Sequence, residues 1–255
     1  MLILGTAVSA ITLTRAVSTI ERWIADRTPH YVCITGVHGV IECRRDPQLR
    51  RIHNEAGMVT PDGMPLVFMA RRLGFTNVSR VYGPDLMRLF TEISAQKGYR
   101  QFYYGGGPGL AERLATTLKT RHRTLTVAGT LTPPFRPLTP EEDNAVIARI
   151  NAAAPDILWV GLSTPKQELW MASHIGRLNV PVLVGVGAAF DFLAGTKSQA
   201  PTWMQNCGLE WLYRLTQEPA RLWRRYSRIV PLFMVLAAAQ PINKRMSVSG
   251  RTTEG

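Results

Sequence analysis

Short apolar runs of β-forming residues alternate with segments of helical periodicity through most of this 255-residue chain. Parallel strands need a long crossover connection, usually a helix, and the alternation supplies one between most pairs of runs. The pattern therefore predicts an α/β fold in which a parallel sheet is covered by helices. The expected strands are residues 31–35, 101–104, 125–128, 157–161 and 182–186.

Two threonines mark expected helix starts. Thr14 is placed to cap a helix over residues 15–26, which carries an apolar stripe at helical spacing. Thr139 is followed by Pro140 and two glutamates, which suit the first turn of a helix running to about residue 153. The apolar residues 1–5 are expected to form a first strand, because they lack the basic residues that open a signal peptide.

The composition favours an anionic partner. A formal net charge of +12 suits nucleic acid, an acidic lipid surface or a phosphorylated small molecule, and composition does not choose among them. Cys33, Cys43 and Cys207 are widely separated and lack C-x-x-C spacing, so they support neither a disulfide framework nor a cysteine zinc site. A reducing cytoplasm fits this usage.

The chain changes character near residues 197–201. From Trp203 onward it has three of its six Trp and eight Lys or Arg against three Glu. We therefore expect an α/β core at 1–196, a basic amphipathic helical appendage at 197–246 and a disordered tail at 247–255. The apolar run 229–239 contains Pro231 and falls short of the about 20 residues that cross a bilayer, so we expect a protein that lies on a membrane without spanning it.

The arginines of the appendage share one face of an expected helix, provided that Pro219 lets the helix continue. A basic helix with aromatic residues favours an anionic membrane surface, into which its apolar stripe would insert. The alternatives are a basic solvated face on a helix packed against its own core, and nucleic-acid binding. The arginines are Arg214, Arg221, Arg224, Arg225 and Arg228, and the stripe is Leu222, Tyr226, Ile229 and Phe233.

Polar residues follow several expected strands, where an open parallel sheet places its ligand crevice. His38 follows the strand 31–35, although a lone histidine is at least as often a hydrogen-bonded loop residue. Asp62 follows the apolar run 57–59 within Pro-Asp-Gly, which is also a common turn. Lys166 and Gln167 follow 157–161, and Asp191 follows 182–186, where it either caps a helix or faces the crevice.

Glycines join the strand 101–104 to a helix expected near Leu110. Gly105, Gly106 and Gly107 would let a ligand approach backbone N–H groups at a positive helix end, which favours a phosphate. The string is not G-x-G-x-x-G, because Leu110 stands in place of the third glycine, and the chain contains no P-loop motif. A nicotinamide dehydrogenase and a P-loop nucleotidase are therefore poorly supported.

Six strings occur in order along residues 2–226. They are Arg44-Arg45-Asp46-Pro47 with Asn54-Glu55-Ala56, Pro61-Asp62-Gly63-Met64-Pro65-Leu66-Val67, Tyr82-Gly83-Pro84-Asp85-Leu86, Thr164-Pro165-Lys166-Gln167-Glu168, Gly187-Ala188-Ala189-Phe190-Asp191-Phe192-Leu193-Ala194-Gly195 and Gly208-Leu209-Glu210-Trp211-Leu212-Tyr213-Arg214-Leu215. Together they resemble the WecG/TagA/CpsF family of bacterial glycosyltransferases. The resemblance implies a Rossmann-like core, inverting transfer without a metal or other cofactor, and an appendage that closes the site at the membrane.

The resemblance also assigns roles to residues. The aspartate general base of the family matches Asp62, and its strand-end threonine matches Thr35. The arginine before its Gly-x-Asp-Leu stretch is similar to Arg80. Its remaining substrate-binding residues are similar to Lys166 and Gln167 and, in the appendage, to Arg214, Arg221 and Arg224.

The predicted function is transfer of a hexose or N-acetylhexosamine-type sugar from a UDP-sugar to a polyprenyl-diphosphate-linked saccharide for cell-surface polysaccharide. The attacking hydroxyl needs a base, for which Asp62 is the first candidate and His38 a further one. Because the chain has no Asp-x-Asp, arginines are expected to stabilise the departing UDP. Val37 stands where many members have Asn, which is similar to an exopolysaccharide-associated branch.

The expected location is the cytoplasmic face of the bacterial plasma membrane, with peripheral association and no nucleic-acid partner. The alternative is a non-catalytic nucleotide-binding or nucleic-acid-binding protein whose basic tail grips phosphates. The oligomeric state, including a homo-oligomer, stays open.

Overall fold

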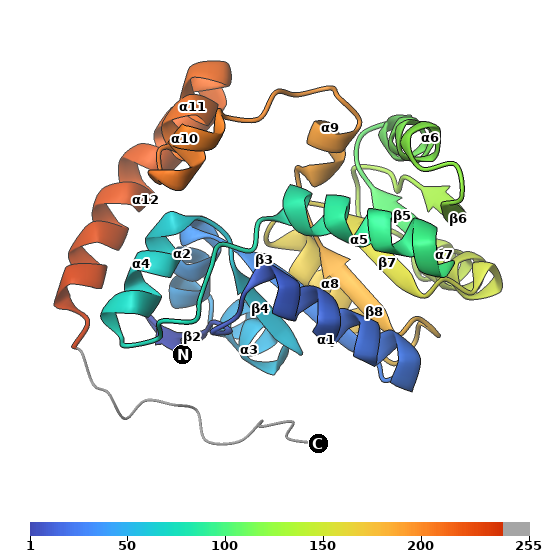
Figure 1. Ribbon diagram of the computed structural model, residues 1–255, viewed down its shortest axis with the longest axis horizontal. Helices are drawn as coiled ribbons and strands as arrows, with labels where there is room; N and C mark the ends of the chain where they lie inside the picture. The colour runs from blue at the N-terminus through green and yellow to red at the C-terminus, as the bar shows by residue number, and fades with distance from the viewer. Residues whose placement is uncertain (242–255) are drawn as a thin grey trace.

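Six parallel strands form one sheet at the centre of the computed structural model, which describes residues 1–241 (Figure 1). The order across the sheet is β4-β3-β8-β7-β5-β6, and every neighbouring pair is parallel. The predicted Rossmann-like α/β fold is therefore confirmed. The strands are β3 (His30–Thr35), β4 (Met58–Pro61), β5 (Arg100–Gly105), β6 (Thr126–Leu131), β7 (Ile157–Gly161) and β8 (Val182–Gly185).

The apolar N-terminus does not join this sheet. β1 (Leu2–Ile3) and β2 (Thr6–Ala7) pair with each other as a small antiparallel hairpin. Asn54 at the end of α3 (Pro47–Glu55) ties the hairpin to the core, because its side-chain oxygen accepts from the Ala7 N–H at 2.8 Å. The expected first strand thus exists, but it lies outside the main sheet.

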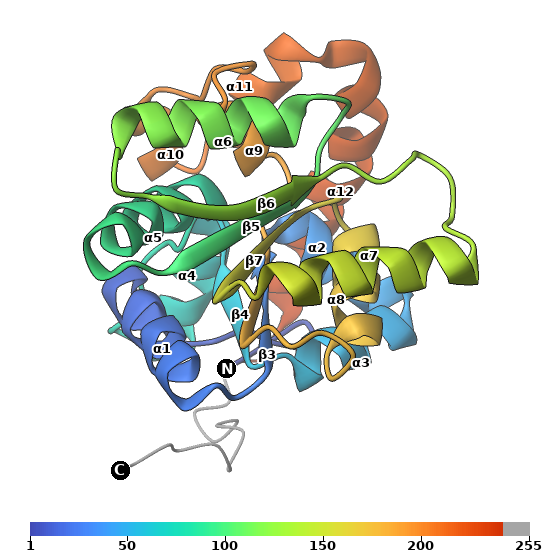
Figure 2. The same cartoon turned by 90° about the vertical axis from the view of Figure 1, so that its right-hand side faces the viewer.

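Helices cover both faces of the sheet, as Figure 2 shows. Successive strand residues point to opposite faces, so Trp159 packs in one apolar cluster and its neighbours Leu158 and Val160 pack in the other. Residues of α1 (Leu13–Asp26), α5 (Gly83–Lys97), α6 (Leu110–Arg121) and α9 (Ala189–Leu193) complete the first cluster. The second contains residues of α2 (Val37–Arg45), α3, α4 (Met64–Arg72), α7 (Pro140–Ala153) and α8 (Lys166–His174).

The two predicted helix caps have different outcomes. Thr139 forms a reciprocal capping box with Glu142, whose backbone N–H donates to Thr139 Oγ1 at 3.3 Å. Thr14, in contrast, lies inside α1, and the cap is Thr12, whose Oγ1 accepts from Arg15 N at 3.3 Å. The side chains of Thr12 and Thr14 could each cap α1. Thr12 is the cap because its backbone is extended, as an N-cap residue requires.

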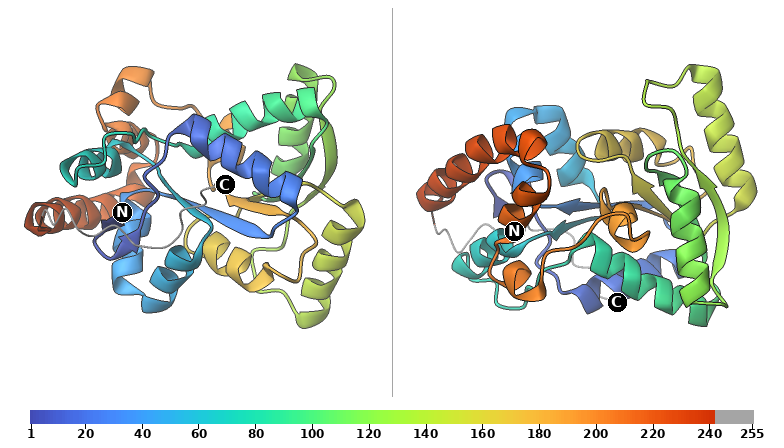
Figure 3. Two further views of the ribbon diagram at one scale, coloured as in Figure 1. Left: turned by 60° about the horizontal axis from the view of Figure 1, so that its bottom comes forward. Right: turned by 90° about the horizontal axis from the view of Figure 1, so that it is seen from above.

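The appendage consists of α10 (Thr202–Asn206), α11 (Glu210–Gln217) and α12 (Pro219–Ala239) within the described residues. Pro219 occupies the first turn of α12, so the single helix that would have carried all five arginines is interrupted there. Pro231 lies inside α12, and Figure 3 shows this helix running beside α2. The predicted tail 247–255 lies outside the described residues, as does the side chain of Arg221.

The apolar stripe of α12 packs on the protein itself, so the prediction that it inserts into a membrane is wrong. Leu222, Ile229 and Phe233 are at most 4% exposed, and the last two belong to the second core cluster. Arg72 on α4 reinforces the packing, because its Nη1 donates to the carbonyl of Ala237 at 2.6 Å. Because the helix covers an apolar face of the core, the side chains of the stripe are removed from water without a bilayer. Within residues 1–241, none of the helices combines the length and apolar character needed to cross a bilayer.

Candidate active site

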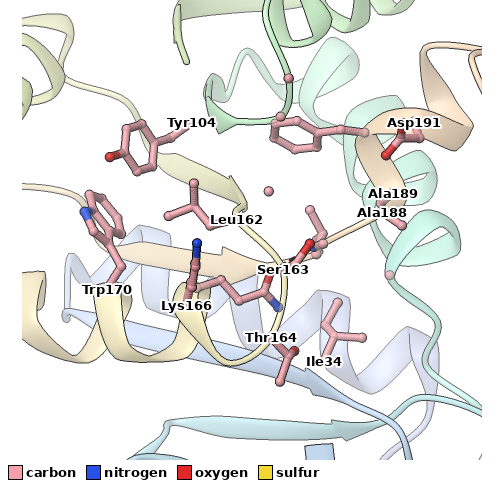
Figure 4. A pocket seen from close by; sticks show the side chains of 18 of the residues that line it. Ile34, Tyr104, Leu162, Ser163, Thr164, Lys166, Trp170, Ala188, Ala189 and Asp191 are labelled. Carbon is pink, nitrogen blue, oxygen red and sulfur yellow. Dashed lines mark hydrogen bonds between the residues drawn. The ribbon is translucent and has the colours of Figure 1, made fainter. Parts of the chain in front are cut away.

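A cavity of about 820 Å³ opens at the carboxyl ends of the strands, the edge at which open parallel sheets bind ligands. Segments that follow all six strands of the sheet line it, and α11 and α12 add residues from the appendage. In Figure 4, Tyr104, Trp170 and Lys166 lie on one side of this space and Asp191 lies on the other. The volume is within the about 300–1,000 Å³ typical of small-molecule sites.

Asp62 lies at the cavity wall directly after β4, held by backbone contacts. Its N–H donates to the carbonyl of Thr35 at 2.9 Å, which continues the pairing of β4 with β3. Gly63 follows with a φ of 103°, a conformation that favours glycine. A Cβ on Gly36 would lie 3.0 Å from the Asp62 carbonyl oxygen, so the close approach of the two loops also requires glycine there.

The charges around Asp62 come from both the core and the appendage. Burial raises the pKa of Asp62 to about 7, and the negative charge of Glu210 on α11 adds to the rise. The positive charges of Arg80 and Arg214 act in the opposite direction. A carboxylate with a pKa near neutrality can accept a proton from a hydroxyl and is still ionised in part at pH 7. Asp62 therefore has the environment of a general base.

Arg80 links the core to the appendage and does not line the cavity. Its Nη2 donates to Oε1 of Gln205 on α10 at 2.6 Å, and its Nη1 lies 3.8 Å from Oε2 of Glu210. The guanidinium also stacks over the ring of Tyr82, 4.1 Å from the ring centroid. These contacts make Arg80 a residue that fixes α10 and α11 beside Asp62.

Arg214 reaches the cavity from α11. Its guanidinium carbon lies 6.0 Å from the ring centroid of Phe192. Burial lowers the pKa of Arg214, but the neighbouring acidic groups of Tyr226, Tyr82, Glu210 and Asp62 outweigh burial and raise it overall. Arg214 is therefore a permanent positive charge next to the carboxylate of Asp62.

The glycines at the end of β5 lie against the backbone of β7. Gly105 has a φ of 117°, and a Cβ on it would lie 2.6 Å from the carbonyl oxygen of Gly161. The N–H of Gly106 donates to that same carbonyl at 2.9 Å. Gly106 and Gly107 line the cavity, whereas Gly105 supports them from behind. Gly106 and Gly107 thus face the cavity, but the N–H of Gly106 is already bonded within the protein and differs in this from the prediction of a free donor.

Lys166 and Gln167 face different surroundings although they are adjacent at the start of α8. Lys166 is exposed and lines the cavity, where its ammonium group is available to an anion. Gln167 is 2% exposed, and its amide bonds within the protein. Its Oε1 accepts from Gly187 N at 3.0 Å and its Nε2 donates to buried Glu168 at 3.1 Å. Gln167 thus fixes the loop after β8.

Neither Ser163 nor Thr164 caps α8 with its side chain. The N-cap of α8 is Pro165, and Thr164 instead donates to Glu168 Oε1 at 2.8 Å. Glu168 is 1% exposed, and its carboxylate accepts hydrogen bonds from Thr164 and Gln167, which both line the cavity. This network positions the backbone after β7 and β8.

Thr35 and His38 follow the same strand but have different access to the cavity. Thr35 is 2% exposed, does not line the cavity, and donates from Oγ1 to the carbonyl of Cys33 at 3.4 Å. His38 on α2 does line it. Burial lowers the pKa of His38, and the positive charge of Arg225 lowers it further. His38 is therefore held largely neutral at pH 7, with a ring nitrogen able to accept a hydrogen bond.

The appendage arginines divide between the cavity and the solvent. Arg225, expected to face lipid, lines the cavity with Arg214. Arg224, expected to bind substrate, is exposed and lies outside the lining, as does Arg228. α12 is a separate helix that begins at Pro219. Its orientation on α2 therefore determines which of its arginines face the cavity.

Asp191 on α9 lines the cavity as predicted. Thr196 donates to both its backbone oxygen and its carboxylate, at 3.0 and 3.3 Å. Within residues 1–241, no cluster of three or more His, Cys, Asp or Glu is arranged to hold a metal ion.

Sequence reasoning missed two parts of the site. Glu210 was noticed only within a family string, yet its charge acts directly on Asp62. The segment 133–138 between β6 and α7 lines the cavity along its whole length, together with Tyr104 and Trp170. It begins a few residues beyond the predicted strand 125–128, and residues that follow the other predicted strands also line the cavity, so its place in the sequence was a usable signal.

The comparisons with known proteins agree with this geometry. The model of the Glycosyl transferase WecG/TagA/CpsF family matches residues 1–247. An N-acetylglucosaminyldiphosphoundecaprenol N-acetyl-beta-D-mannosaminyltransferase of Bacillus spizizenii is 28% identical over 214 residues, which cover 84% of this chain and 81% of that protein. The family match spans nearly the whole chain, and the protein therefore belongs to the WecG/TagA/CpsF family of glycosyltransferases.

Proposed function

We propose that this glycosyltransferase moves a hexose or N-acetylhexosamine-type sugar from a UDP-sugar to a polyprenyl-diphosphate-linked saccharide, for cell-surface polysaccharide. The observation that carries the proposal is the carboxylate of Asp62, which faces the cavity with a pKa raised to about 7. The Bacillus spizizenii relative, whose name specifies a diphosphoundecaprenol-linked acceptor, supports an acceptor of the same class here.

In the proposed reaction Asp62 takes the proton of the attacking acceptor hydroxyl. The hydroxyl oxygen forms a bond to the anomeric carbon from the face opposite the leaving group, and the bond from that carbon to the UDP oxygen breaks. UDP leaves with the bonding electrons, and the configuration at the anomeric carbon inverts. The proton remains on Asp62 until solvent removes it.

Fixed positive charges would stabilise the departing diphosphate. Lys166, Arg214 and Arg225 line the cavity from three different helices, and Gly106 and Gly107 offer close backbone approach. Cations fixed in advance act on charge that develops in the transition state without reorganisation at the moment of reaction. We therefore propose that transfer needs no divalent metal, with Thr35, Arg80 and Gln167 acting as positioning residues.

Membrane docking is proposed for a different surface from the one that the sequence indicated. Trp203, Trp223 and Met234 are each more than 60% exposed, and Trp223 and Met234 lie about three helical turns apart on one face of α12. Exposed Arg224 and Arg228 on the same helix would meet anionic headgroups. We propose peripheral binding to the inner face of the plasma membrane through this surface.

A transfer assay tests the function. Radiolabelled sugar is followed from UDP-sugars to a polyprenyl-diphosphate saccharide, with and without excess EDTA. We expect transfer that EDTA leaves nearly unchanged and that Asp62→Asn lowers by roughly 10²–10⁴-fold while UDP binding persists. A rate abolished by EDTA and restored by Mg²⁺ would reject the metal-independent mechanism, and near-wild-type turnover of Asp62→Asn would reject the base.

A separate assay tests the docking surface. Sedimentation with vesicles of phosphatidylglycerol and phosphatidylcholine should decrease in a Trp223→Ala, Met234→Ala double variant and should weaken as salt rises. Turnover of a short water-soluble acceptor should stay close to that of the wild type. Unchanged sedimentation of the double variant would mean that another surface contacts the membrane.

A further inference from the structure

An acidic and a basic side chain that the proposed mechanism does not use are buried in the protein. His53 on α3 and Glu168 on α8 are each 1% exposed. α3 packs against α8 on one face of the sheet, as Figure 2 shows. A Cβ on Gly39 would lie 3.9 Å from His53 Nε2 and 2.9 Å from Cγ2 of Thr35, so the ring of His53 lies beside the end of β3.

The hydrogen bonds of these two side chains leave one atom of each without a partner. His53 Nδ1 lies 3.0 Å from the carbonyl oxygen of Leu49, which can only accept. Nδ1 therefore carries a hydrogen, and a neutral ring keeps a lone pair on Nε2. Oε1 of Glu168 accepts from Thr164 and Gln167. In the described part of the chain, Glu168 Oε2 and His53 Nε2 have no partner, so two buried acceptors are unsatisfied on neighbouring helices.

The charges of the pair point to one missing hydrogen. Burial lowers the pKa of His53, and the negative charge of Glu168 acts in the opposite direction, which is expected for a carboxylate near the ring. The groups that donate to Glu168 are a hydroxyl and an amide, so an ionised Glu168 beside a neutral His53 would be a buried charge bonded only to neutral groups. One added proton makes the pair neutral overall and lets a single hydrogen bond satisfy both atoms.

We propose that His53 and Glu168 share one proton between Nε2 and Oε2, and that this hydrogen bond positions the cavity wall for sugar transfer. A carboxylate held at Oε2 cannot rotate, so Oε1 stays directed at Thr164 and Gln167, which line the cavity. Gln167 in turn accepts from the N–H of Gly187 in the loop after β8. His53 is thus a positioning residue that acts through Glu168. Its effect on turnover, unlike the shared proton, rests on the proposed function.

Enzyme rates separate this role from ordinary packing. In His53→Leu the new side chain is apolar and leaves Oε2 of Glu168 unbonded, whereas in His53→Gln an amide N–H can donate to it. We expect His53→Leu to lower kcat at least about tenfold, because small displacements of groups that line a site are costly in rate, and His53→Gln to stay within about threefold of the wild type. The matched control is Ile52→Val, a change at a 7% exposed position of α3, which should lower the Tm and leave kcat and KM unchanged.

Two kinetic results would overturn the positioning role. One is an equal loss of kcat in His53→Leu and His53→Gln. The other is a His53→Leu variant that loses stability, as Ile52→Val does, and keeps its turnover.

NMR of the wild type tests the shared proton without any transfer assay. The chain has five histidines, and His53→Gln identifies the ring signals of His53 in protein with isotope-labelled histidine. We expect both ring nitrogens to show the chemical shifts of hydrogen-bonded atoms, and the bond at Nε2 to be lost in Glu168→Leu. An Nε2 with a free lone pair in the wild type would overturn the proposal. A bond at Nε2 that survives in Glu168→Leu would assign it to another donor, such as a buried water, and would overturn it as well. Absence of transfer by the wild type would instead overturn the proposed function, so the two failures are distinguishable.

Discussion

The pH dependence of turnover tests the role of Asp62 most directly. The ionised carboxylate is the form that accepts a proton, and kcat/KM reports the protonation state of the free enzyme. With a pKa of about 7, the ionised fraction is about one half at pH 7 and about 1% at pH 5. We therefore expect kcat/KM to fall nearly tenfold per pH unit on the acidic side. An aspartate at its ordinary value of 3.8 would show almost no loss down to pH 5.

Glu210 of the appendage contributes to the raised pKa of Asp62. Glu210→Gln removes a negative charge that raises the pKa of Asp62, so the acidic limb of the profile should move to lower pH. Burial is the larger cause and persists in the variant, so the limb should stay above the position of an ordinary aspartate. Glu92→Gln, an exposed change on α5, should leave the limb in place.

The assay is initial-rate transfer to a short water-soluble acceptor between pH 5 and pH 9, at subsaturating substrate. Stability is checked at each pH by incubating the enzyme and returning it to pH 8. An acidic limb that does not move in Glu210→Gln would refute the electrostatic role of the appendage. A profile that is flat between pH 5 and pH 8 in the wild type would refute the raised pKa itself.

Three further predictions concern stability. The pKa of Asp62 is higher in the folded chain than its ordinary 3.8, so its contribution to stability is lost as pH rises toward about 7, and the Tm of Asp62→Asn relative to wild type should be higher at pH 8 than at pH 4. Phe233→Ala should lower the free energy of unfolding in urea by about 3–5 kcal/mol, whereas Met234→Ala, at a 63% exposed position, should stay within about 0.5 kcal/mol. Gly105→Ala should lower the Tm and UDP affinity together, because its Cβ would collide with the backbone of Gly161, and a fully stable variant would contradict this contact.

The fold was predictable because it depends on local patterns. Apolar runs separated by helical segments permit little other than a covered parallel sheet, and the observed strands overlap all five predicted runs. The placement of His38, Asp62, Lys166 and Asp191 at the cavity follows from the same logic, since parallel strands end at one edge. The family strings added the role of Asp62, which Pro-Asp-Gly alone left open between turn and catalysis.

The arrangement of the appendage depends on tertiary structure. Its stripe of Leu222, Ile229 and Phe233 has the periodicity of a membrane-binding helix, and the same periodicity serves a helix packed on a core. The hydrophobic effect is not directional. The sequence therefore predicts that the stripe is buried, and the tertiary structure determines which surface buries it. The same orientation of α12 turns Arg225 into the cavity and leaves its neighbour Arg224 in solvent.

The sequence by itself determined the order of the elements, the edge of the sheet that binds ligand and the identity of the candidate base. Only the tertiary structure brought Glu210 and Arg214 to Asp62, and the segment 133–138 to the cavity. Residues 62 and 210 are separated by most of the chain, and no local pattern encodes the distance between their charges. Because electrostatic interactions depend on distance and burial, the pKa of Asp62 is a property of the folded molecule.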